Sequence, residues 1–176
     1  GLRFLNPPHF LLVVAPFGLM PYGAAKLLFL ALTFGALAAL ANLVAGAVPA
    51  LHRRFDTVLV LLVFSPAMFA SLIIMQIGPL VAPLLAGGLL LARRRPVLAG
   101  LLLALATMKP QFGLMAPIYL AARGEWRAII AAIGWTIALC LGASAAFGFE
   151  IWPAFVKSLS TIHAAHASIL HRDMVS

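Results

Sequence analysis

The stretch that decides the fold runs from Arg93 to Arg127 and reads RRRPVLAGLLLALATMKPQFGLMAPIYLAARGEWR. Its apolar part, residues 97–122, lies between two clusters of arginines, and such clusters favour the cytoplasmic face of a membrane. If both clusters share that face, the 26 residues between them enter the membrane and return. Each arm of this hairpin spans roughly 18 Å of a hydrocarbon core about 30 Å thick. We predict the hairpin, with its turn at MKPQFG; the alternative is one helix, broken at Pro110, that carries Arg123 to the opposite face.

The composition assigns the whole chain to a membrane. Of its 176 residues, 64% are hydrophobic and 9% are charged, whereas soluble domains carry about 25% charged residues. The net charge of +8 would also suit a nucleic-acid-binding protein. However, the cations form short clusters between apolar segments, without the basic stripe and exposed aromatics that such a surface needs. The sequence therefore predicts an all-α, polytopic transmembrane helical bundle with short or broken helices, and no nucleic-acid partner.

Further apolar segments flank the hairpin on both sides. A crossing helix needs about 20 mostly apolar residues, and proline interrupts helices. The segment Phe10–Met20 contains Pro16 and is too short to cross, which predicts an interfacial or re-entrant helix. The longer predicted segments are 22–49, 57–75 with a kink at Ser65-Pro66, 80–92, which returns the chain to the arginines, and 126–147.

These segments predict a single transmembrane domain over residues 1–176. About 1–150 would be embedded in the membrane, and the more polar 151–176 would belong to an extracytoplasmic loop. We expect a multi-pass protein of the cell (inner) membrane. Because the chain starts at Gly1 without an initiator methionine, we also expect it to be a fragment of a longer protein.

Lys109 is the strongest candidate for chemistry. A charged side chain at membrane depth is rare and usually faces a cavity or a partner. Pro110 breaks the helix beside it, and broken backbone at depth is tolerated where it lines a water-filled cavity. An ammonium group there can hold an anion such as a lipid phosphate, and Gln111 can add a neutral hydrogen bond. The alternative is a lysine whose side chain extends along the protein to the membrane surface.

Two more polar residues are candidate site residues. Gln76 lies in the turn MQIGP and is either a site amide or an ordinary loop amide. His9 follows Pro7-Pro8 in NPPHF, where it can touch a polar headgroup or simply belong to a stiff entry turn. We keep both residues as candidates for substrate binding.

The remaining histidines and the cysteine predict no chemistry. His163 and His166 share a helix face at i, i+3 spacing, with His171 nearby, but Asp173 is the only carboxylate close to them in the sequence. We expect solvated loop histidines, no metal site and no cofactor. Cys140 lies in an apolar segment, where a packed and inert thiol is expected.

Two blocks of the sequence resemble a family of membrane enzymes. The first, Asn6–Leu32, reads NPPHFLLVVAPFGLMPYGAAKLLFLAL, and the second, Met75–Ala128, contains MQIGP, RRR, KPQFG and YLAARGEWRA in that order. Together they cover roughly half of the chain. In order, spacing and cationic loops they resemble the polyprenol-phosphate-sugar-dependent glycosyltransferases of family 87.

The match can be followed at single positions. Lys109-Pro110 corresponds to the KP of that family, and Gln76 corresponds to its Gln. Met75 stands where the family usually has Gly, and Asn6 stands where it usually has Tyr.

The resemblance implies a GT-C-like membrane fold and a sugar transferase. The sugar, typically mannose and in some members arabinose, would pass from a polyprenyl-phosphate donor to a lipid-linked glycan acceptor, without direct use of a nucleotide sugar. Members of the GT-C type usually carry a catalytic Asp or Glu in a first extracytoplasmic loop, which here would precede Gly1. The catalytic base is therefore unknown, and we expect the chain alone to be inactive.

The implied reaction is a direct displacement at the anomeric carbon. A loop carboxylate would deprotonate the acceptor hydroxyl. Lys109 would stabilise the polyprenyl phosphate leaving group, whose charge grows in the transition state.

A transporter or flippase of an anionic lipid or metabolite is the alternative function. Broken helices around a cation near the midplane also suit transport. A transporter should show repeated halves with matching breaks, but the sequence has no second KPQ-like element. A non-catalytic membrane scaffold, the third possibility, would need no lysine at depth.

Overall fold

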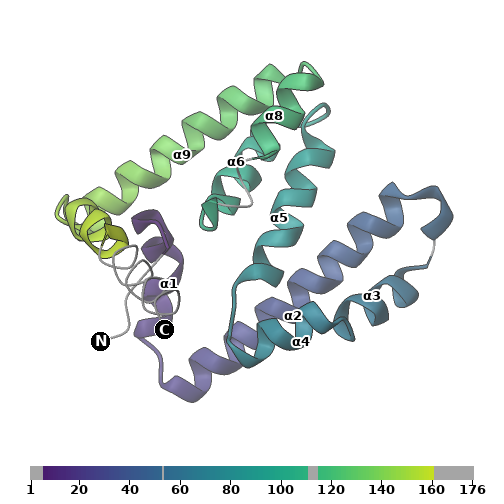
Figure 1. The fold of residues 1–176 in the computed structure, drawn as a ribbon, viewed down its shortest axis with the longest axis horizontal. Coiled ribbons are helices and arrows are strands. Elements are labelled where there is room, and N and C mark those ends of the chain that lie inside the picture. The colour runs from purple at the N-terminus through teal and green to yellow at the C-terminus, as the bar shows by residue number, and fades with distance from the viewer. Residues whose placement is uncertain (1–5, 53, 111–114, 161–176) are drawn as a thin grey trace, which may run out of the picture.

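The computed structural model describes residues 6–52, 54–110 and 115–160. In these ranges every regular element is a helix, which confirms the predicted all-α fold (Figure 1). In chain order the elements are η1 (Pro8–Phe10), α1 (Leu11–Gly18), α2 (Tyr22–Ala47), η2 (Pro49–Leu51), α3 (Phe55–Val63), α4 (Pro66–Ile73), α5 (Gly78–Leu91), α6 (Pro96–Ala106), α8 (Met115–Ala122) and α9 (Trp126–Phe147), and residues 151–160 are helical as well.

Among the described residues, two helices are long and apolar enough to cross a membrane, α2 with 26 residues and α9 with 22. α3 and α4 together make a third candidate, bent by 51° at the break between them. The break falls at Ser65-Pro66 because Pro66 has no N–H to donate and its ring clashes with a preceding turn. Ser65 then caps α4, its hydroxyl oxygen accepting the Met68 N–H at 3.2 Å. The predicted kink is confirmed.

The segment between the two arginine clusters forms a hairpin, as predicted. α6 leads away from the first cluster and α8 returns to the second; the loops that join α5 to α6 and α8 to α9 lie at one end of the molecule (Figure 1). Arg93 and Arg127, one from each cluster, line the same pocket. The alternative of a single broken helix that separates the clusters is therefore wrong. α6 has 11 residues, so it rises only about 16 Å.

Contacts that only glycine allows hold α6 between α5 and α9. A Cβ atom on Gly100 of α6 would lie 2.5 Å from the Cβ of Ala131 in α9. A Cβ atom on Gly88 of α5 would lie 2.6 Å from the Cγ of Leu103 in α6. Non-bonded carbon atoms settle about 3.5–4.0 Å apart, so glycine is required at both positions. The core around these contacts consists of Ala92, Ala99, Leu103, Ala116, Leu120 and Ala128.

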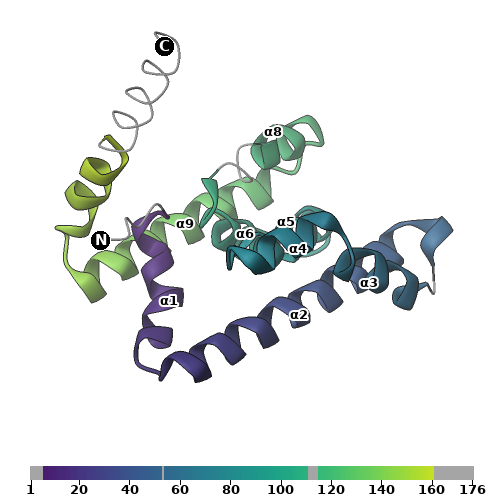
Figure 2. The same ribbon diagram turned by 60° about the horizontal axis from the view of Figure 1, so that its bottom comes forward.

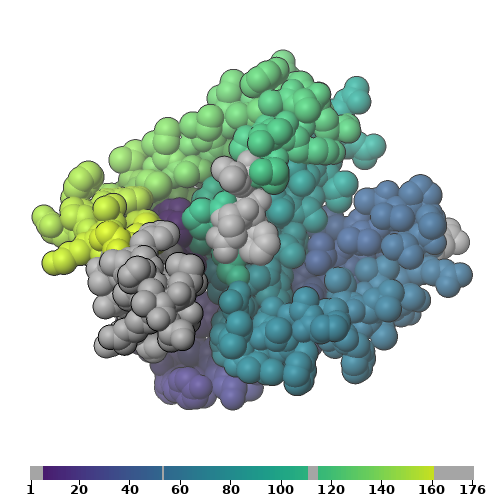
Figure 3. All heavy atoms as spheres, viewed as in Figure 1, coloured from purple at the N-terminus to yellow at the C-terminus, as the bar shows by residue number. Residues whose placement is uncertain are grey.

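Helices α2, α3 and α4 form a looser region on the other side of α5. α3 lies against the C-terminal part of α2 (Figure 2), where Ala41, Ala45 and Val58 form a small buried cluster. Large apolar side chains on α3, on α4 and at the break between them stay uncovered, including Phe64 at the break, which is 81% exposed. In the space-filling view this region (blue) makes up one flank of the molecule (Figure 3). An apolar surface of this extent suits contact with lipid tails.

Candidate functional site

Lys109 lies just beyond the end of α6. The helix ends at Ala106, and the Lys109 N–H still donates to the Ala106 carbonyl at 3.1 Å. Pro110 disfavours the helical conformation at the residue before it, so the last helical turn closes ahead of Lys109. The lysine is half-buried, at the break that the sequence predicted.

Gln76 lies in the turn between α4 and α5. Met75, just before it, has a φ of 49°, a left-handed conformation that costs a residue with a Cβ roughly 1–2 kcal/mol. The Gln76 N–H donates to the Ser71 carbonyl at 2.8 Å and the Met75 N–H to the Leu72 carbonyl at 3.3 Å. These two bonds are the Schellman pattern that ends many helices, usually with glycine in the left-handed position. Met75 therefore adopts a left-handed backbone conformation that glycine would adopt without strain.

The break after α6 and the turn between α4 and α5 are in contact through their side chains. Lys109 Nζ donates a hydrogen bond to Gln76 Oε1 at 2.6 Å. Gly78, at the start of α5, faces the same ammonium group, because a Cβ atom there would lie 3.6 Å from Lys109 Nζ. The Gln76 amide is neutral, so this hydrogen bond orients the ammonium group without itself neutralising the charge. Two of the predicted site residues, 33 positions apart, are thus brought together.

The position of this pair along α5 gives its depth. α5 begins two residues after Gln76 and has 14 residues, so it rises about 21 Å before it reaches the arginine loop. The hydrocarbon core is about 30 Å thick. With the arginines at one membrane surface, the pair lies inside the hydrocarbon thickness. A lysine at the centre of the membrane costs about 2.5–3.5 kcal/mol; the cost is smaller away from the centre, and an anionic partner would offset it.

His9 is buried, with 5% of its surface exposed, and supports the end of α6. Its Nε2 lies 3.1 Å from Thr107 Oγ1. The Thr107 hydroxyl donates its proton to the Ala104 carbonyl at 2.6 Å, so His9 Nε2 carries a proton and donates. Nδ1 is left to accept from the Cys140 thiol at 4.0 Å, a weak contact. The imidazole thereby ties η1 and α9 to the residue two positions before Lys109.

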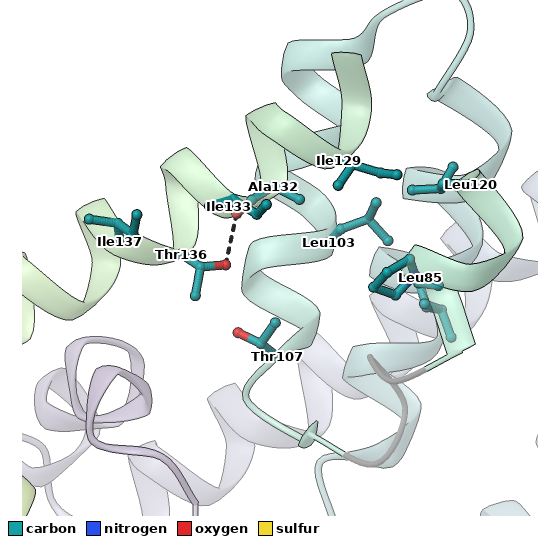
Figure 4. Close-up of a pocket in the computed structure, with 11 residues that line it drawn as sticks. Leu85, Leu103, Thr107, Leu120, Ile129, Ala132, Ile133, Thr136 and Ile137 are labelled. Atoms are coloured by element: carbon teal, nitrogen blue, oxygen red, sulfur yellow. Dashed lines mark hydrogen bonds between the residues drawn. The ribbon is translucent and has the colours of Figure 1, made fainter. Parts of the chain in front are cut away.

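Two apolar cavities lie next to these residues. One of about 290 Å³ lies between α5, α6, α8 and α9, with Thr107 at one end (Figure 4). Its other hydroxyl belongs to Thr136, which donates to the Ala132 carbonyl at 2.8 Å. The second cavity, of about 560 Å³, lies between α2, α3, α4 and α5, with Gly78 and Ser71 in its wall. Gly78 is thus part of the wall of the larger cavity and is also near the ammonium group, since a Cβ atom there would lie 3.6 Å from Lys109 Nζ.

The other predicted site residue, Gln111, and three histidines fall in parts of the chain that the structure does not describe. Gln111 lies outside the described residues, so its predicted hydrogen bond stays a prediction. His163, His166 and His171 lie outside them too. In the ranges that the structure describes, no three His, Cys, Asp or Glu side chains are grouped to hold a metal ion.

Sequence reasoning missed the partners of His9. Thr107 lies 98 positions away and Cys140 lies 131 positions away. No local pattern connects residues at such separations. Only the packing of η1 against α9 brings them together. For His9 the sequence left open a headgroup contact or a stiff entry turn, and in the structure both ring nitrogens lie next to protein groups.

Comparisons with known proteins complete the description of the site. The sequence model of glycosyltransferase family 87 matches residues 4–172. This match covers Lys109, Gln76 and His9. Searches among curated proteins and among solved structures gave no match.

Proposed function

The chain belongs to glycosyltransferase family 87, and on this premise we propose that it transfers a sugar from a polyprenyl-phosphate donor to a lipid-linked glycan acceptor. The family makes it a membrane glycosyltransferase. We propose mannose as the sugar, with arabinose as the second candidate, and the cell (inner) membrane as its location. Lys109 binds the phosphate of the donor.

One observation carries this proposal: the hydrogen bond of 2.6 Å between Lys109 Nζ and Gln76 Oε1 at the meeting of two helix breaks. A lysine that only had to reach the membrane surface would extend away from the bundle. Here it extends instead toward a second break. The amide orients the ammonium group, which is the group that would contact the phosphate.

The larger apolar cavity supports a donor with a long hydrocarbon chain. It is lined by the aliphatic residues of α2 and α5 together with Ser65 and Ser71, and its volume is about 560 Å³. Its wall includes Gly78, where a Cβ atom would lie 3.6 Å from Lys109 Nζ. A polyprenyl chain in this cavity would therefore bring its phosphate to the ammonium group.

The chemistry of the leaving group explains why a cation is needed. When the bond between the sugar and the phosphate breaks, negative charge grows on the bridging oxygen. A preorganised donor aimed at that charge lowers the barrier, and it acts more strongly where water is excluded. Lys109 supplies this donor, Gln76 positions it, and the base that activates the acceptor is left to residues that this site does not contain.

The substitution Lys109→Met in the full-length enzyme tests the proposal. Methionine keeps most of the side-chain volume but has no charge, so the protein should insert and purify normally. We expect the rate of sugar transfer from the polyprenyl donor to fall by about 100-fold, the loss typical of removing one donor to an oxyanion. Lys26→Met, which changes an exposed lysine of α2, is the matched control and should keep full activity.

Full activity of Lys109→Met would overturn the proposed role. A protein that moves the polyprenyl lipid between membrane leaflets without transferring the sugar would instead favour the flippase.

A further inference from the structure

The end of the bundle that carries the arginines contains a pocket that the proposed reaction does not use. The pocket has a volume of about 410 Å³ and lies between the loop that joins α5 to α6 and the loop that joins α8 to α9. Arg93 and Arg94 line it from the first loop, and Arg127 lines it from the second. It lies at the opposite end of α5 from Gln76 and Lys109.

The second wall of the pocket is formed by the residues that follow the C-terminal end of α8. Gly124 has a φ of 72°, the left-handed conformation that glycine adopts without strain. Its N–H donates to the Ala121 carbonyl at 3.0 Å, and the Glu125 N–H donates to the Leu120 carbonyl at 2.9 Å. This Schellman ending of α8 turns the chain back at once, so that Arg127 falls in the first turn of α9, across from the other loop.

The charge of the pocket is strongly positive. Its lining residues include three arginines and one acidic residue, Glu125. The carboxylate can offset one of the three charges and leaves a net excess of two. Guanidinium groups match the oxygens of a phosphate with pairs of N–H donors. A phosphate or phosphodiester is thus the ligand chemistry that this pocket fits.

An apolar groove adjoins the pocket. It has a volume of about 410 Å³ and is lined by Val97, Leu98 and Leu101 of α6 and Trp135 of α9, together with Arg95 and Pro96. Pro96 lines the pocket as well, so the basic and the apolar surfaces meet at this residue. Trp126, in the wall of the pocket and 59% exposed, is a residue type that favours the headgroup level of a membrane.

We propose that this end of the molecule binds an anionic phospholipid. The headgroup phosphate lies among Arg93, Arg94 and Arg127, and one acyl chain lies in the groove along Val97 and Trp135. Basic pockets between membrane helices at the cytoplasmic surface bind anionic headgroups in this way. Orienting the protein in the membrane requires only positive charge in short loops. A concave pocket with an adjoining apolar groove is not needed for orientation, and it indicates that a ligand binds there.

The site is independent of the proposed sugar transfer. It is formed by other residues and lies at the other end of α5, so lipid binding can be measured without enzyme activity. The Lys109→Met protein should bind the phospholipid as the unchanged protein does. Failure of one proposal therefore leaves the other intact.

The test is native mass spectrometry of the purified full-length protein, titrated with phosphatidylglycerol or with phosphatidylcholine of the same acyl chains. We expect phosphatidylglycerol to bind at least tenfold more tightly. The triple variant Arg93→Gln, Arg94→Gln, Arg127→Gln should lose this preference, because each arginine near an anionic headgroup contributes about a fivefold effect. Arg54→Gln, which changes an exposed arginine outside the pocket, should leave the preference unchanged.

A second set of variants covers the case in which the triple variant does not insert. Arg93→Lys, Arg94→Lys, Arg127→Lys keeps the charge that orients the protein but has no paired donors, and it should bind phosphatidylglycerol several-fold more weakly. Equal binding of the two lipids, or unchanged binding by both triple variants, would overturn the proposal. Displacement of phosphatidylglycerol by millimolar inorganic phosphate would also overturn it, since the pocket would then accept a free anion without a lipid.

Discussion

The two sides of α5 are packed in opposite ways. Toward α6 and α9, the helices approach so closely that Gly88 and Gly100 have no room for a Cβ atom. Toward α3 and α4, large apolar side chains are exposed, and a cavity of about 560 Å³ lies between these helices, α2 and α5. Gly35 of α2 has nothing within 4 Å of the position of a Cβ atom. Under the proposed function, the close-packed side holds Lys109 in place and the loose side accommodates the hydrocarbon chain of the donor.

A matched pair of glycine substitutions tests this contrast and should give the largest effect. Gly100→Ala forces a methyl group to within 2.5 Å of Ala131, and such overpacking should lower the free energy of unfolding by about 3 kcal/mol. Gly35→Ala adds a methyl group in open space inside a helix and should raise it by up to about 1 kcal/mol. Thermal unfolding of the two purified full-length variants measures both. Equal melting temperatures would show that α6 and α9 are not in close contact.

The hairpin shows what the sequence can predict. The two arginine clusters indicated that both ends of the hairpin lie at one face, because positive charge orients the loops. Pro110 indicated the break, because proline interrupts a helix. The same reasoning located the kink at Ser65-Pro66. The hairpin follows from the preference of arginines for one side of a membrane, and the kink follows from a single proline. Neither depends on contacts between residues far apart in the sequence.

The support behind Lys109 shows what the sequence cannot predict. The contacts of His9 with Thr107 and Cys140 come from the packing of helices far apart in the chain. The close contacts of Gly88 and Gly100 could not be predicted either. A glycine in an apolar helix gives the same sequence pattern whether its neighbour is another helix or lipid. The resemblance pointed to Gln76, but only the structure brings it to within 2.6 Å of Lys109.

Changing the partner of Lys109 should give the next largest effect. Gln76→Glu converts the hydrogen bond into an ion pair, which strengthens the contact but neutralises the ammonium group. If Lys109 serves to bind phosphate, transfer activity should fall by about 10-fold to 100-fold, equivalent to about 1.5–3 kcal/mol. Gln76→Leu, which leaves the charge in place, should lose less activity. Steady-state rates of the two variants decide the matter; an active Gln76→Glu enzyme would mean that Lys109 has only a structural role.

Removing the support under α6 should give a smaller effect. His9→Ala deletes a buried ring and its hydrogen bond to Thr107, so we expect a loss of about 2 kcal/mol in the free energy of unfolding. His52→Ala, at an exposed position, is the control and should change the stability by less than about 0.5 kcal/mol. Matched thermal melts would reveal the difference. Equal stability of the two variants would rule out the anchoring role of His9.

The smallest expected effect lies on the loose side of α5. Met75 adopts a left-handed φ of 49°, and Met75→Gly should remove that strain and raise the free energy of unfolding by about 1 kcal/mol. Ile74→Gly, one residue earlier at a position with a φ of −99°, should destabilise instead. A Met75→Gly protein that melts below the unchanged protein would contradict the conformation described for this turn.

The most direct test measures how much the donor's phosphate contributes to binding, with and without Lys109. Dissociation constants are determined for polyprenyl phosphate and for the corresponding polyprenol, on the unchanged full-length protein and on Lys109→Met. On the unchanged protein the phosphate should improve affinity by at least about tenfold, as expected for a hydrogen bond to a charged group. On Lys109→Met this advantage should nearly vanish while polyprenol binds both proteins equally. An equal advantage on both proteins would contradict the assignment of Lys109 as the residue that binds the phosphate.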